Sequence, residues 1–140
     1  MFGFHPLNLA FRLVLELAAI AALAVGGYAV GELVVDSGVF PWVLAIGLPL
    51  AAIAAWGVFN VPGDRSRSGE APVPVVGIVR LIVELDVFGA AVVVVWFANP
   101  AYAVALGACV VIHYGLSLDR IRWLLTNEGG SSRMRVAPHE

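Results

Sequence analysis

Residues 6–17 read PLNLAFRLVLEL, an apolar stretch in which Arg12 is followed four residues later by Glu16. The same arrangement recurs 68 residues further along the chain, where Pro74 precedes Arg80 and Glu84. The shared pattern is Pro-x5-Arg-Leu-x2-Glu-Leu, and each copy opens a long hydrophobic segment. The chain is therefore expected to contain two similar helical hairpins, each beginning with this pattern.

The composition indicates a protein that resides in lipid. Of the 140 residues, 61% are hydrophobic and only 13% are charged, and the mean hydropathy is +0.93. A soluble domain of this size could not cover so much apolar surface. The single cysteine, Cys109, allows neither an intramolecular disulfide nor a cysteine-based metal site.

Four apolar segments are long enough to cross a bilayer, whose hydrocarbon core of roughly 30 Å requires about 20 helical residues. They are residues 6–31, 40–59, 75–97 and 101–122. Residues 60–73 are rich in proline, glycine, serine and charge, which is typical of a polar loop.

We therefore predict an all-α, polytopic membrane protein. Residues 1–125 are expected to form a single transmembrane domain, with four helices arranged as two parallel hairpin repeats in a four-helix bundle. Residues 126–140 have no periodic apolar pattern, so we expect a flexible cytoplasmic tail there.

The arginines predict how the helices are oriented. All eight lie near the start of the first helix, in or just after the middle loop, or at the C-terminal end. The two short turns on the other side carry Glu32 and Asp36 but no basic residue. The positive-inside rule then places both termini and the middle loop in the cytoplasm. Because the chain has no lysine, a bias compatible with a GC-rich prokaryotic genome, we expect a prokaryotic cell membrane.

Several segments resemble a known family. They are His5-Pro6-Leu7-Asn8-Leu9, Ile46-Gly47-Leu48-Pro49 with Trp56-Gly57, and Phe88-Gly89 after the second Arg-Leu-x2-Glu-Leu pattern. This combination resembles the YrdB-like family of small prokaryotic four-helix membrane proteins, over the first three helices well and over the fourth loosely. The resemblance implies the fold and the membrane location. It adds no catalytic residue, because the family has no assigned activity, and Asp86 stands where the family pattern leads us to expect an apolar residue.

Charged residues inside the predicted helices are the candidate site, because each costs roughly 2.5 to 3.5 kcal/mol to insert into a membrane. Arg12 and Glu16 share one helix face, as do Arg80 and Glu84, so each pair can neutralise itself. The two pairs could also face one another as a cluster of four charges. Such a cluster is either a structural clamp between the first and third helices or a proton or cation site at the cytoplasmic mouth of a cavity.

The short turn at residues 99–100 predicts the register of the last two helices, since residues whose numbers sum to about 199 should lie at equal depth. Asp119 then lies level with Arg80 and joins the cluster, and Asp86 lies level with His113 near mid-bilayer. A lone carboxylate at that depth needs a proton or a partner. Asp86 and His113 could form a proton relay or a structural hydrogen bond between helices. Equal depth does not prove contact, however. Asp86 lies about 120° around the helix from Arg80, so the two level pairs cannot both be central in one helix interface.

No phosphate-binding loop, nucleophile with a base, HExxH or CxxC pattern is found in the sequence. We therefore expect no enzymatic activity, no metal or other cofactor, and no nucleic-acid partner. The basic residues near the predicted cytoplasmic surface are expected to contact anionic lipid headgroups. They are Arg65, Arg67, Arg120 and Arg122.

Three functions fit these features. The preferred one is a non-catalytic membrane module that supports an assembly or binds a partner subunit or lipid. The first alternative is a small, homodimeric, proton-coupled transporter or channel that uses the buried acidic residues and His113. The second is a haem-binding electron-transfer subunit that uses His5 and His113.

Overall fold

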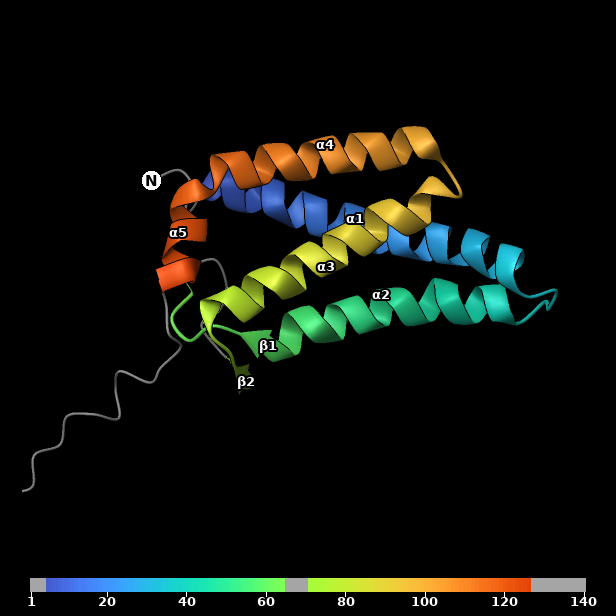
Figure 1. The fold of residues 1–140 in the computed structure, drawn as a ribbon, viewed down its shortest axis with the longest axis horizontal. Helices are drawn as coiled ribbons and strands as arrows, with labels where there is room; N and C mark the ends of the chain where they lie inside the picture. Colours follow the sequence, from blue (N-terminus) through green and yellow to red (C-terminus); the bar gives the residue numbers. More distant parts are fainter. Residues whose placement is uncertain (1–4, 65–70, 127–140) are drawn as a thin grey trace, which may run out of the picture.

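The computed structural model describes residues 5–64 and 71–126. These residues form five α-helices and one pair of two-residue strands (Figure 1). The prediction of an all-α protein is confirmed. The elements are α1 (Pro6–Val34), α2 (Phe40–Val58), β1 (Phe59–Asn60), β2 (Val73–Pro74), α3 (Gly77–Trp96), α4 (Pro100–Leu116) and α5 (Leu118–Thr126).

Local capping explains where two of the helices begin. The side chain of His5 accepts a hydrogen bond from the Leu7 amide at the start of α1, and Asn99 accepts one from the Tyr102 amide at the start of α4. Helix α3 begins at Gly77, slightly later than predicted, because the residues before it form β2, which pairs with β1 directly after α2. β1 and β2 run parallel, and the Val75 amide donates to the Asn60 carbonyl at 2.9 Å. These bonds hold together the two ends of the middle loop.

The structure replaces the single helix predicted for residues 101–122 by two helices whose axes differ by 69°. Ser117 lies between them with non-helical backbone angles (φ −106°, ψ 21°). Its Oγ accepts a hydrogen bond from Asn8 Nδ2 at 2.8 Å, which ties the bend to the start of α1. Beyond the bend, α5 lies at the end of the molecule where α1 and α3 begin, and it packs against α3 (Figure 1). Hydropathy alone could not predict this break, because it does not report the direction of a helix axis.

Helix α1 is central to the packing, since it contacts α2, α3 and α4. Much of the core is made of small side chains, with Ala19, Ala22 and Ala91 completely buried. Gly26 lies directly against the backbone of α3 at Val94, and a Cβ atom on Gly26 would overlap those atoms. Small residues of this kind allow helix backbones to approach closely.

The outward faces of the helices are apolar. Large hydrophobic side chains are exposed along α1, α2, α3 and α4; Val111 on α4, for example, is 73% exposed. A water-soluble monomer rarely shows contiguous apolar surface on this scale. Among the described residues, α1 and α2 are long and apolar enough to cross a membrane, and the bent α4–α5 pair adds a third candidate if it counts as one span.

The close contact between α1 and α3 predicts the effect of adding one methyl group. Gly26→Ala should lower the thermal unfolding midpoint of the detergent-solubilised protein, because the new Cβ meets fixed backbone atoms of α3. Gly47→Ala is the matched control, since a Cβ there meets no atom within 4 Å and alanine favours the helix. Equal midpoints for the two variants would contradict the proposed role of Gly26 in packing.

Candidate functional site

The carboxylate of Glu84 on α3 is the centre of a buried ionic cluster. Its Oε1 accepts hydrogen bonds from Arg12 Nη2 at 2.8 Å, Arg80 Nε at 2.9 Å and Arg120 Nη2 at 2.9 Å. Its Oε2 accepts a bond from Arg120 Nη1 at 3.0 Å. Arg120 therefore contacts Glu84 with two nitrogen atoms, the two-pronged geometry that suits arginine and carboxylate.

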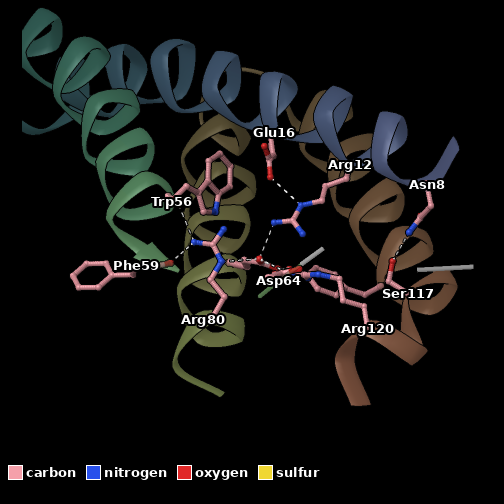
Figure 2. Close-up of polar contacts among 11 residues, drawn as sticks. Asn8, Arg12, Glu16, Trp56, Phe59, Asp64, Arg80, Ser117 and Arg120 are labelled. Atoms are coloured by element: carbon pink, nitrogen blue, oxygen red, sulfur yellow. Dashed lines mark hydrogen bonds and ion pairs between the residues drawn. The ribbon is translucent and has the colours of Figure 1, made fainter. Parts of the chain in front are cut away.

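Two further carboxylates complete the cluster, which Figure 2 shows around the labelled arginines. Arg12 Nε donates to Glu16 Oε1 at 3.0 Å, and Arg120 Nη2 donates to Asp64 Oδ2 at 2.9 Å. The named groups are thus three guanidinium ions and three carboxylates, so their formal charges cancel.

Arg80 also holds the end of α2. Its Nη1 donates to the carbonyl oxygens of Trp56 at 3.0 Å and Phe59 at 2.6 Å. The last carbonyl groups of a helix have no partner within that helix, and the negative end of the helix dipole favours a cation there. Arg80 therefore joins α2 to the cluster as well as α3.

The cluster is shielded from its surroundings. The side chains of Arg80, Arg120 and Glu84 are at most 2% exposed, whereas Glu16 at the edge is 17% exposed. Burial alone would lower the pKa of Arg120, but the carboxylates of Glu84 and Asp64 outweigh this effect and raise that pKa above its ordinary value. Arg120 on α5 therefore stays charged.

The structure brings together the four charged residues of the repeated pattern. Arg12 with Glu16, and Arg80 with Glu84, form ion pairs four residues apart within their own helices, and Arg12 crosses from α1 to Glu84. Asp119, which the register placed level with Arg80, lies half-buried in the first turn of α5.

Sequence reasoning missed two members of the cluster. The sequence predicts Arg120 at the lipid headgroups, but the chain bends at Ser117 and the Arg120 side chain is buried. Asp64 follows the turn at Gly63, which has a positive φ of 81°, and no periodic pattern marks it. Neither residue carries a signal in hydropathy, because both positions depend on how the chain turns after a helix or strand ends.

Asp86 and His113 are not brought together. Asp86 is exposed on the side of α3 that faces α2, and no hydrogen bond or ion pair of Asp86 occurs within residues 5–64 and 71–126. His113 is 3% exposed and stacks edge-on against Phe11 and Tyr114. Asp86 follows Glu84 by two residues, about 200° around the helix, so the inward position of Glu84 turns Asp86 outward.

Three other arginines are predicted to contact lipid headgroups. Arg122 is exposed on α5, whereas Arg65 and Arg67 lie outside the described residues. The predicted tail from residue 127 onward also lies outside them. In the part of the chain that the structure describes, no group of three or more histidine, cysteine or acidic residues could hold a metal ion.

The fold and the cluster define a class of small all-helical protein with apolar helices of membrane-spanning length, joined at one end by buried ions. The chain belongs to the family described as "Protein of unknown function (DUF2568)", which matches residues 10–112. It is 39% identical over 120 residues to the "Uncharacterized protein YrdB" of Bacillus subtilis (strain 168), covering 84% of this chain and 93% of that protein. The resemblance to the YrdB-like family is confirmed. No solved structure matches the chain.

The central position of Glu84 predicts the effect of neutralising it. Glu84→Gln leaves three buried guanidinium groups facing two carboxylates, so it should destabilise the fold by about 3–5 kcal/mol, the usual cost of breaking a buried ion pair. The yield of monodisperse protein and its thermal unfolding midpoint measure this loss. Glu32→Gln, at an exposed position near the end of α1, is the control and should behave as wild type. Equal stability of the two variants would contradict the central role of Glu84.

Proposed function

We propose that the chain is a multi-pass protein of a prokaryotic cell membrane that acts as a non-catalytic module, supporting an assembly or binding a partner subunit or lipid. In this proposal α1 to α4 cross the bilayer as a four-helix bundle of two parallel hairpins. Both termini face the cytoplasm. The observation that supports the proposal most strongly is the buried cluster of ion pairs around Glu84.

Helix α3 is not recognised as a transmembrane helix from its composition, because it carries three charged residues, Arg80, Glu84 and Asp86. Two of these charges are buried and paired with each other, so lipid would not meet them as free ions. The helix has 20 residues, and at 1.5 Å per residue it is about 30 Å long, the thickness of the hydrocarbon core. Its length and the burial of its charges therefore support a transmembrane position.

The cluster also supports the proposed orientation. Arg12 near the start of α1, Arg80 near the start of α3 and Arg120 after α4 all bind Glu84, so these three ends lie on one side of the molecule. Two hairpins whose first helices begin on the same side are parallel repeats. The positive-inside rule assigns the arginine-bearing side to the cytoplasm.

The pairing within the cluster favours a structural role over transport. A proton or cation carrier needs ionisable groups that open to water, whereas Glu84 is 2% exposed and bound by three arginines. A relay through Asp86 and His113 is not favoured, because Asp86 is exposed whereas His113 is buried against Phe11. A haem held by His5 and His113 has no support either, since His5 is exposed at the start of α1 and the His113 ring contacts Phe11.

Cysteine labelling in intact cells tests the four-span topology. In a Cys109→Ser background, Ser37→Cys in the α1–α2 turn and Ala98→Cys before α4 should react with a membrane-impermeant maleimide added outside the cells. Pro72→Cys, at an exposed position of the middle loop, should react only after the membrane is permeabilised. Labelling of Pro72→Cys in sealed cells, or protection of Ala98→Cys, would contradict the four-span arrangement.

The structural role and the transport role give opposite results with purified protein in liposomes. If the cluster has a structural role, Glu84→Gln should lower the yield of folded protein. Wild-type protein should then show no proton flux along an imposed pH gradient. A Glu84→Gln variant that accumulates normally but abolishes a wild-type proton flux would overturn the structural role.

A further inference from the structure

Asp86 is an acidic side chain at the middle of α3 that the cluster does not use. It follows Gly77, the first residue of the helix, by nine positions and precedes Trp96, the last residue, by ten, so it lies about 15 Å from either end. Its side chain is exposed, and within the described residues it makes no hydrogen bond or ion pair. If α3 spans the membrane as proposed above, this carboxyl group lies near mid-bilayer, where it needs a proton or a counter-charge.

Asp86 opens into a groove between α1, α2 and α3. Its other walls are apolar: Leu23 on α1, Leu48 and Ala51 on α2, and Val87 and Ala90 on α3. The groove holds about 230 Å³, slightly less than the roughly 300–1,000 Å³ of typical small-ligand pockets. It therefore suits a compact ligand, part of which remains in the surrounding lipid.

A second copy of the chain does not offer a suitable counter-charge. The arginines of the described residues lie in the cluster or on α5, and Arg80, the one nearest to Asp86 in sequence, precedes it by six residues, about 9 Å along α3. His113, which the register places at the depth of Asp86, is 3% exposed and closed off by Phe11. Among the residues that the structure describes, a second copy therefore offers no basic group at the depth of Asp86, and the counter-charge is expected from a molecule of another kind.

We propose that this groove is a binding site for a lipophilic monovalent organic cation, with Asp86 as its counter-ion. The apolar walls would hold the hydrocarbon part of the ligand, and the carboxylate would hold its positive centre. In a medium of low dielectric constant, the attraction between the two charges of such a pair is far stronger than it is in water. This inference rests on the transmembrane position of α3 in the proposed function.

Binding of radiolabelled tetraphenylphosphonium to the full-length protein in detergent tests this site. The charge of this probe does not change with pH. Wild-type protein should bind it, and Asp86→Asn should bind it at least about tenfold more weakly because the counter-charge is gone. Ala90→Leu should also weaken binding, because it fills the groove without changing the charge. Asp36→Asn, which removes an exposed carboxylate from the α1–α2 turn, is the control and should bind as wild type.

Two outcomes would contradict the cation site but leave the proposed topology unaffected. One is wild-type protein that does not bind the probe, and the other is Asp86→Asn protein that binds it equally well. A change in oligomeric mass in Asp86→Asn without any cation binding would show that another protein chain occupies the groove. Labelling of Asp86→Cys, in the Cys109→Ser background, separates failure of this site from failure of the proposed topology. Protection from an impermeant maleimide on both sides of the membrane is expected, and labelling would refute the transmembrane position of α3 and the cation site together.

Discussion

The rest of the structure depends on the binding of one carboxylate, Glu84, by three arginines. A buried charge without partners would cost several kcal/mol, so each of these groups is stable in its place only while the others remain. Arg12, Arg80 and Arg120 belong to α1, α3 and α5, and Arg80 also binds carbonyl groups at the end of α2. The positions of these four helix ends are thereby coupled. Buried ion pairs often add little net stability, but this cluster restricts which ends can meet.

Packing of a different kind holds the opposite ends of the helices. Gly26 on α1 lies against the backbone of α3, and Gly31 lies against Pro41 at the start of α2. Contacts of this kind depend on the absence of a side chain and not on charge. Ionic contacts at one end and close backbone contacts at the other together position α1 against its neighbours. The groove that contains Asp86 is lined by α1, α2 and α3 and lies between these two regions along α1.

The sequence was informative where a pattern repeats within a helix. Residues four apart on a helix must lie on one face, so the duplicated pattern identified Arg12, Glu16, Arg80 and Glu84 without knowledge of the tertiary structure. Positions set by a change of chain direction could not be found in this way. Arg120 reaches Glu84 only because the helix breaks at Ser117, and that break depends partly on a hydrogen bond from a residue more than 100 positions away. The register across the turn at residues 99–100 likewise predicts that Asp86 and His113 lie at equal depth in the membrane. It does not predict the direction in which either side chain points.

A double-mutant cycle of Glu84→Gln and Arg80→Gln, read out as thermal unfolding in detergent, tests the central role of Glu84 most directly. The double variant keeps two complete ion pairs, Arg12 with Glu16 and Arg120 with Asp64, and has no excess charge among the remaining groups of the cluster. Arg80→Gln also removes the donor to the Trp56 and Phe59 carbonyl oxygens, so each single variant should be destabilised. We expect the combined loss to be clearly smaller than the sum of the two single losses, because the second substitution removes a charge that the first one leaves unpaired. Strictly additive losses would show that Arg80 and Glu84 act independently and would contradict the cluster as the organising interaction.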